Sequence, residues 1–234
     1  DEVWIPQAAV EETLREYGYK GKVEVVDNGS DFAGNIPVEQ LRRSARDKLR
    51  LPSDEFMFLF VGQHIWEKNL EFLLEALAEI RTLPFRMYFI GSGYAASELR
   101  RKTEDLYLTD KVIFMGSITE RERLKLYYAA ADLFLFPSLY DNAPLVVREA
   151  AALHTPSLLI KGSTSAEVIH DSVNGFLSDN SVTAYASRIS QLLETPQLIA
   201  EAGEAASHSI ARSWEDVVEE VYDRYVNLIH RSGN

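Results

Sequence analysis

Two carboxylates that follow a buried apolar stretch are the residues best suited to chemistry. After the run that ends at Phe136, a turn carries Asp141, and Glu149 stands about two helical turns further on. A helix that begins between them, with Asn142 able to cap it, offers unpaired amides and a positive dipole to an anion. Nearby carboxylates can accept hydrogen bonds from sugar or ribose hydroxyl groups. The spacing therefore predicts a site for a ligand with both anionic and hydroxyl groups.

The acidic pair taken alone has an equally good structural explanation, as one acid in the first helical turn and one exposed acid on the same helix. The sequence lacks the residues that other kinds of active site require. The five histidines show no metal-ligand spacing, and the chain has no Walker lysine loop, no Gly-X-Ser-X-Gly and no Gly-X-Gly-X-X-Gly after its first buried strand. The nearest mimic, at 161–165, has its lysine before the glycine and is interpreted as a turn that caps a helix.

The elements that must position these residues alternate between short apolar runs and helical periodicity. The predicted strands cover 56–61, 86–90, 111–115, 132–136, 157–160 and 175–177, and the predicted helices cover 70–80, 95–106, 120–130, 145–153, 182–193, 197–209 and 214–229. This rhythm predicts an α/β fold with a Rossmann-like, doubly wound parallel sheet of about six strands, helices on both faces and C-terminal helices packing across. Ligands bind beyond the carboxyl ends of such strands, where glycine turns follow.

The first part of the chain follows a different pattern, with a strand at 3–5, a helix at 8–17 and a strand at 23–26. Turn-forming residues at 27–31 then indicate a linker. We therefore expect residues 1–27 to be the tail of a missing N-terminal domain with the start of the linker, and residues 28–234 to be the C-terminal domain. Because the chain begins at Asp1 without a signal-peptide pattern, it is interpreted as an internal piece.

Composition excludes several partners. A formal net charge of −12 argues against nucleic acid, and the basic cluster at 41–46 is interpreted as a solvated helix face. No apolar run reaches the roughly 20 residues that span a bilayer. The absence of cysteine excludes disulfides and thiolate metal sites and favours a reducing, cytoplasmic setting, with membrane contact by a longer protein left open.

An ordered set of motifs identifies a family. The segment from Pro137 to Ala150 resembles the pattern of retaining glycosyltransferases of the family 4 type: Pro-Ser, two residues, Glu, seven residues, Glu-Ala. Further similar segments occur in the family's order, at 28–31, 60–62 with 67–69, 91–93, 114–116, 130–132 and 174–177. The resemblance covers residues 23–229 and implies the C-terminal, nucleotide-sugar-binding domain of a two-domain, B-type (GT-B) fold.

The resemblance also implies roles. Glu149 would bind the ribose hydroxyls of a nucleoside diphosphate sugar, Asp141 and the amides after it would hold the sugar, and Lys68 would neutralise the departing pyrophosphate. Lys68 and Asp141 are the implied catalytic residues, without a metal or cofactor and with a UDP-sugar favoured. The implied donor-binding residues are Gly62, Gln63, His64, Lys68, Gly91, Gly93, Ile118, Asp141, Asn142, Ala143, Leu145, Val146 and Glu149.

Three departures from the family pattern fall in the implied site. Gln63 stands where the family has arginine, so one phosphate cation is missing; His64 either partly replaces it or is a structural histidine that leaves the phosphate to Lys68. Asp141 replaces glutamate and is one methylene shorter. Pro144 replaces glycine and has no amide hydrogen to donate.

The acceptor would bind through the missing N-terminal domain, so we expect this chain to bind nucleotide weakly and to transfer little sugar. Apolar residues of the last helix would pack on that domain and could promote self-association when exposed: Trp214, Val217, Val218, Val221, Tyr222 and Tyr225. A non-catalytic nucleotide-sugar-binding domain of the same fold is the alternative, supported by the three departures. A nicotinamide dehydrogenase is a third reading, which the missing glycine fingerprint opposes.

Overall fold

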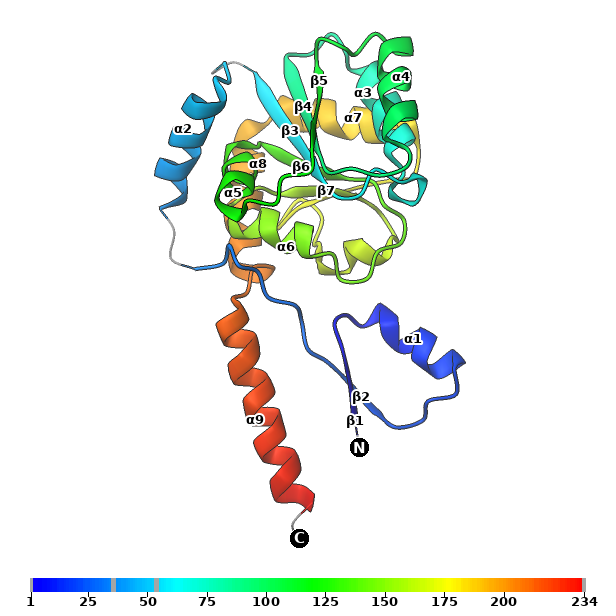
Figure 1. The fold of residues 1–234 in the computed structure, drawn as a ribbon, viewed down its shortest axis with the longest axis vertical. Coiled ribbons are helices and arrows are strands. Elements are labelled where there is room, and N and C mark those ends of the chain that lie inside the picture. The colour runs from blue at the N-terminus through cyan, green and yellow to red at the C-terminus, as the bar shows by residue number, and fades with distance from the viewer. Residues whose placement is uncertain (1, 35–36, 53–54, 233–234) are drawn as a thin grey trace.

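The computed structural model describes residues 2–34, 37–52 and 55–232, and its strands form two separate sheets (Figure 1). A small N-terminal unit has two parallel strands, β1 (Glu2–Ile5) and β2 (Lys22–Val25), joined by helix α1 (Ala9–Glu16). The larger sheet contains six parallel strands in the order β5-β4-β3-β6-β7-β8. These are β3 (Phe56–Val61), β4 (Phe85–Ile90), β5 (Val112–Gly116), β6 (Leu133–Phe136), β7 (Ser157–Ile160) and β8 (Phe176–Ser178).

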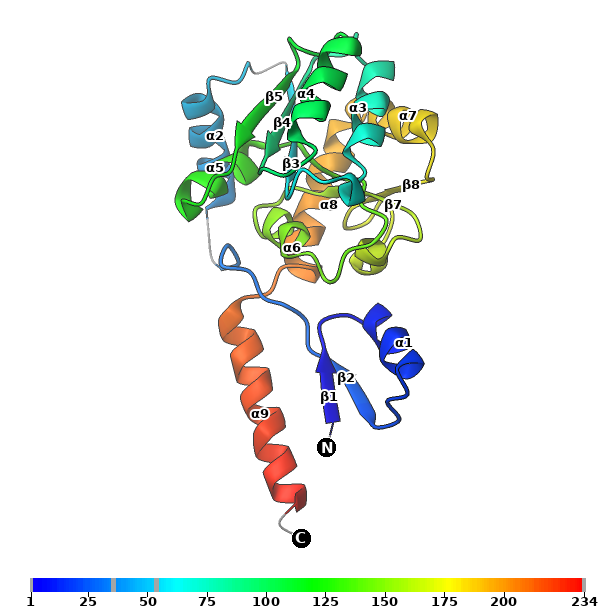
Figure 2. The same ribbon diagram turned by 45° about the vertical axis from the view of Figure 1, so that its right-hand side comes forward.

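Helices cover both faces of the larger sheet, which confirms the predicted doubly wound α/β fold (Figures 1 and 2). On one face lie α3 (Leu70–Glu79), α4 (Ala96–Asp105) and α7 (Val182–Leu193), and on the other α2 (Val38–Leu49), α5 (Arg121–Ala130) and α6 (Leu145–Ala152). Helix α8 (Pro196–Ser209) packs against both α6 and α7. Pro196 stands in its first turn, where a missing amide hydrogen costs nothing.

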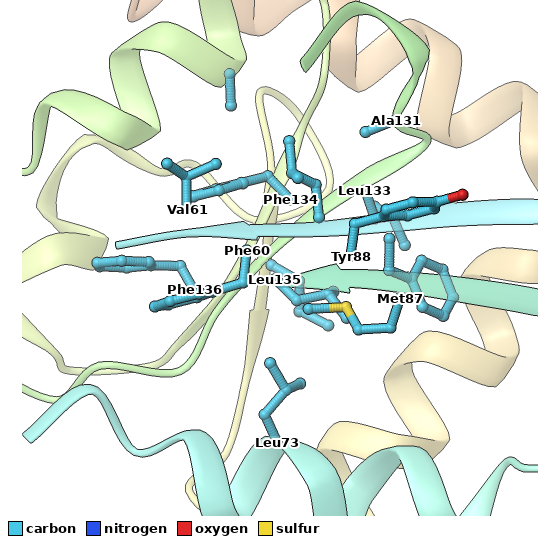
Figure 3. Close-up of a cluster of buried hydrophobic side chains, with 14 of the residues drawn as sticks. Phe60, Val61, Leu73, Met87, Tyr88, Ala131, Leu133, Phe134, Leu135 and Phe136 are labelled. Atoms are coloured by element: carbon cyan, nitrogen blue, oxygen red, sulfur yellow. The ribbon is translucent and has the colours of Figure 1, made fainter. Parts of the chain in front are cut away.

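The core is continuous because the central strands are apolar on both sides. Strands β3 and β6 are almost entirely buried, and their side chains pack at the centre of the sheet, with Leu73 of α3 closing one face (Figure 3). The rings of Phe60 and Phe136 are stacked with centroids 5.9 Å apart. Offset aromatic pairs of this kind add to the stabilisation from burial. The ends of β3 and β6 are therefore a rigid base for the loops that follow them.

The basic cluster on α2 is only partly a solvated face, which corrects the sequence interpretation for two of its three arginines: Arg43 is exposed, whereas Arg42 and Arg46 are half-buried. Arg42 and Arg46 both contact the carboxylate of Asp132, and Arg42 also donates to the carbonyl of Ala131 at 2.6 Å. The same carboxylate accepts the backbone amide of Met57 at 2.7 Å. These arginines therefore neutralise a partly buried acid and satisfy carbonyls at the end of α5, so they anchor α2 to the domain.

Helix α9 (Trp214–Ser232) leaves the larger domain and runs beside the N-terminal unit (Figures 1 and 2). Ser213 and Asp216 cap it reciprocally. Arg224 contacts Glu24, and the rings of Trp4 and Tyr225 meet edge to face with centroids 5.0 Å apart. Helix α9 and the N-terminal unit are thus held together by an ion pair and an aromatic contact.

The expected apolar face of α9 is only partly exposed. Val217 is buried, whereas Val218, Tyr222 and Tyr225 are more than half exposed. Self-association through this face stays a prediction, as does the domain boundary before residue 28. Within the described ranges, no helix combines the length and the apolar character that crossing a membrane requires.

Candidate donor-binding site

A cleft of about 410 Å³ opens where the order of the sheet reverses. Strand β3 connects through α3 to β4 on one side, while its other neighbour is β6, so the loops after β3 and β6 diverge from each other. Ligands of open α/β sheets bind at such switch points. The cleft is lined by Asn28, Val61, Gly62, Gln63, Lys68, Phe136, Asp141, Asn142, Ala143, Pro144, Leu145 and Val146.

The structure therefore brings eight of the predicted donor-binding residues to this cleft. They are Gly62, Gln63, Lys68, Asp141, Asn142, Ala143, Leu145 and Val146. The other five lie outside its lining: His64, Gly91, Gly93, Ile118 and Glu149. Binding by these residues stays a prediction, because the structure shows their positions and holds no donor.

Lys68 and Asp141 form an ion pair inside the cleft. Nζ of Lys68 contacts Oδ2 of Asp141, and only about a fifth of each side chain is exposed. The ammonium group also lies 5.7 Å from the centroid of the Phe136 ring, at the end of β6. Asn69, in a left-handed conformation with φ 57°, ends the 3-10 turn that carries Lys68, and its side chain donates to the Pro137 carbonyl at 3.2 Å. The cation is therefore held in the lining of the cleft, against the end of β6.

The loop that carries Asp141 is fixed by residues far away in the sequence. The hydroxyl group of Thr164 lies 2.8 Å from both the backbone nitrogen and the carbonyl oxygen of Asp141. From the N-terminal unit, the Gln7 amide accepts the Ala143 N–H at 2.7 Å and donates to the Asp141 carbonyl at 3.3 Å. The carboxylate of Asp141 thus projects from a backbone that is tied on both sides.

Asn142 does not cap α6, which corrects the sequence prediction. Ala143 takes a left-handed φ of 45°, Pro144 occupies the cap position, and the helix begins at Leu145 without a side-chain cap. Pro144 has no N–H, and no acceptor within the described ranges receives the amides of Leu145 or Val146. These two amides and the helix dipole therefore make the end of α6 attractive to an anion.

Glu149 lies one helical turn beyond Val146, on the same side of α6, and its side chain is 9% exposed. Hydrogen bonds to both of its carboxylate oxygens fix the orientation of the group. Oε1 accepts a hydrogen bond from Arg121 and Oε2 one from the hydroxyl group of Tyr128, both at 2.7 Å. Burial, reinforced by the Glu149 charge, raises the pKa of the Tyr128 phenol well above its usual value, so the phenol remains a proton donor.

His64 is packed in the interior, with 2% of its surface exposed. This position matches the interpretation of His64 as a structural histidine. Its ring lies about 6 Å from the rings of Phe60, Phe89 and Phe114. Burial, with a smaller contribution from Arg100, lowers its pKa, so protonation is disfavoured. Its Nε2 atom is buried without a hydrogen-bond partner among the described residues. A part for His64 in phosphate binding therefore stays a prediction, and Lys68 is the cation among the residues that line the cleft.

Gly91 and Gly93 allow the loops after β3 and β4 to touch. A Cβ atom on Gly91 would lie 1.9 Å from the Gly62 carbonyl oxygen, and one on Gly93 would lie 2.3 Å from the His64 carbonyl oxygen. Both positions therefore exclude any larger residue. Ile118 is partly buried and packs against the core. In the part of the chain that the structure describes, no three His, Asp or Glu side chains are grouped as metal ligands.

Four residues that the sequence analysis did not assign to the site hold its functional groups: Gln7, Arg121, Tyr128 and Thr164. Their contacts join segments that lie far apart in the chain, and Gln7 and Asp141 are 134 positions apart. No local pattern marks such partners. The sequence also does not single out Tyr128, because Tyr127 beside it is buried on the same helix.

The sheet and its switch-point cleft define an open, doubly wound class of α/β domain, in which ligands bind at the switch point. The chain belongs to the group 1 glycosyl transferases, because the model of that family matches residues 42–209. It is similar to D-inositol 3-phosphate glycosyltransferase 2 of Catenulispora acidiphila, with 31% identity over 232 residues that cover 93% of this chain and 54% of that protein. The family resemblance seen in the motifs is thereby confirmed.

Solved structures share the fold. Sucrose-phosphate synthase from Thermosynechococcus elongatus matches with a TM-score of 0.84 and 26% identity, over 99% of this chain and 59% of that one. The Anabaena protein HepE, solved in complex with UDP and glucose, matches with a TM-score of 0.80 and 20% identity, over 96% of this chain and 62% of that one. The chain spans about half the length of the curated relatives it matches.

Proposed function

We propose that this chain is the donor-binding part of a glycosyltransferase that moves a sugar from a nucleoside diphosphate sugar, UDP-sugar by preference, to an acceptor. The reaction would retain the anomeric configuration and need no metal ion. The observation that carries the proposal is the placing of Lys68 and the free amides of α6 on one cleft, with Glu149 one turn deeper. This order matches a pyrophosphate followed by a ribose.

The ion pair in the cleft suggests how the residues would act. A bound pyrophosphate competes with Asp141 for the ammonium group of Lys68, because both are anions within reach of one cation. Lys68 and the helix amides then stabilise the charge that develops as the diphosphate leaves. Asp141, released from Lys68, becomes available to accept hydrogen bonds from the sugar hydroxyls.

The acceptor would come from outside this chain. Residues 1–27 would be the tail of an N-terminal acceptor-binding domain, and the cleft would be completed by that domain. Gln7 supports this arrangement, because it already links the N-terminal unit to the backbone of the Asp141 loop. The chain by itself should therefore bind donor weakly and turn it over slowly.

Calorimetry with UDP, GDP, ADP and NAD in buffer containing EDTA tests donor binding. We expect UDP to bind most tightly and without a divalent ion. Tighter binding of NAD, or UDP binding only after Mg²⁺ or Mn²⁺ is added, would contradict the proposal. Retention is tested by slow cleavage of UDP-glucose in dilute methanol at high protein concentration. The α-methyl glycoside is expected, and the β-methyl glycoside would exclude retention.

A further inference from the structure

Arg121, the first residue of α5, contacts the Glu149 carboxylate and lies outside the motifs that carry the family resemblance. Its Nη2 donates to Oε1 of Glu149 at 2.7 Å and lies 3.2 Å from Oδ2 of Asp31. Its guanidinium carbon lies 4.2 Å from the centroid of the Phe32 ring. Packing on an aromatic face restrains a long side chain that would otherwise sample many rotamers. The guanidinium group is therefore fixed beside the carboxylate.

This pair has hydrogen-bonding capacity that the protein leaves unused. The Arg121 side chain is 41% exposed, and no acceptor within residues 2–34, 37–52 and 55–232 receives a hydrogen bond from its Nη1. Nε is buried without an acceptor, so further donation must come from the terminal nitrogens. Each carboxylate oxygen of Glu149 accepts one bond here and can accept another. A donor and an acceptor thus lie side by side.

We infer that Arg121 is a specificity-determining residue that recognises a ribose hydroxyl together with Glu149. A hydroxyl group can donate its proton to the carboxylate while its oxygen accepts an N–H from the guanidinium group. A deoxy position can do neither, so it leaves both charged partners short of a hydrogen bond. The inference rests on the proposed function, because it needs a nucleotide in the cleft.

The test compares UDP with its 2′-deoxy and 3′-deoxy analogues by calorimetry. The protein is expected to bind UDP more tightly than at least one analogue. The quantity compared is the dissociation constant of the deoxy analogue divided by that of UDP. Arg121→Gln should reduce this ratio by about tenfold, which corresponds to the loss of one hydrogen bond to a charged group. Arg121→Lys keeps the charge but loses the planar fork, so it should also reduce the ratio. Arg123→Gln removes an exposed arginine from the same helix and should leave the ratio unchanged.

A purely structural role for Arg121 predicts a different result. If the arginine only neutralises Glu149, its variants weaken UDP and both analogues by the same factor, and an unchanged ratio would overturn the inference. Should Arg121→Gln fail to fold, Arg121→Lys decides by the same ratio. If the protein binds UDP and both deoxy analogues equally well, the role of Arg121 is refuted while the proposed function stands. A protein that binds no UDP refutes the proposed function, and this inference with it.

Discussion

The two ends of the candidate site hold their charged groups in different ways. At the deep end, the Glu149 carboxylate is nearly buried and takes a hydrogen bond on each oxygen, from Arg121 and Tyr128. At the open end, Lys68 and Asp141 contact each other, and each keeps about a fifth of its side chain exposed. The carboxylate at the deep end is already held by two donors, whereas on the proposed function the open end would exchange one ion pair for another.

The departures from the family pattern lie at one end only. Gln63, Asp141 and Pro144 all line the cleft near Lys68, while Glu149 keeps the residue that the family has. A buried carboxylate that two neighbours already contact tolerates little change, because any replacement leaves those neighbours unpaired. An open ion pair can vary at smaller cost. Chemical variation in this chain is thus concentrated where the phosphate and sugar are expected.

Glu149→Ala should have the largest effect, because it should lower the stability of the fold and remove the carboxylate at the deep end of the site. It leaves the Tyr128 hydroxyl group and the Arg121 guanidinium without their acceptor, so the free energy of unfolding should fall by about 3 kcal/mol in urea titrations. Uridine and UDP should both lose binding, since each carries the ribose. Glu122→Ala, at an exposed position of α5, should change neither property.

An equal loss of stability in the two variants would show that Glu149 is not held as the contacts indicate. A variant that binds uridine as well as the unchanged protein would place the ribose elsewhere. Either result would remove the difference between the deep and open ends.

Lys68→Ala should affect binding but hardly affect stability. On the proposed function the lost ammonium group would contact phosphate, so UDP should bind about tenfold more weakly or worse, while uridine, which lacks phosphate, binds as before. Unfolding should change by about 1 kcal/mol or less, as expected for a partly exposed pair. Lys48→Ala, which removes an exposed lysine from α2, is the control. Weaker uridine binding would show that Lys68 acts through the shape of the cleft instead of its charge.

Local patterns predicted the scaffold because burial leaves a regular signature. Strand β3 was expected at 56–61 and is found at Phe56–Val61, and β7 agrees equally well. A site beyond the carboxyl ends of the strands was expected, but the strand order that places the cleft between the loops after β3 and β6 was not predicted. The parts that local patterns missed depend on long-range contacts. Arg42 and Arg46 looked solvated because their acid, Asp132, stands at the start of a distant strand.

The site was predicted less completely than the fold for the same reason. Lys68 and Asp141 reach one cleft as the motifs implied, but Asn142 is not the helix cap, since Ala143 and Pro144 delay the helix by two residues. His64 was ambiguous because only its packing decides its role. The aromatic rings that surround it come from three strands, and their convergence is a property of the sheet.

Gln63→Arg should have the smallest effect and should make the two ends more alike. It returns to the open end the second cation that the family has, beside a lysine whose charge Asp141 already offsets. UDP affinity should rise by about threefold to tenfold in low salt, and this gain should shrink as salt is raised, because a partly exposed charge is screened. Uridine affinity should stay constant. Gln40→Arg makes the same charge change at an exposed position of α2 and should not tighten UDP binding. Equal gains in the two variants would mean that the net charge of −12, and not the open end of the cleft, limits nucleotide binding.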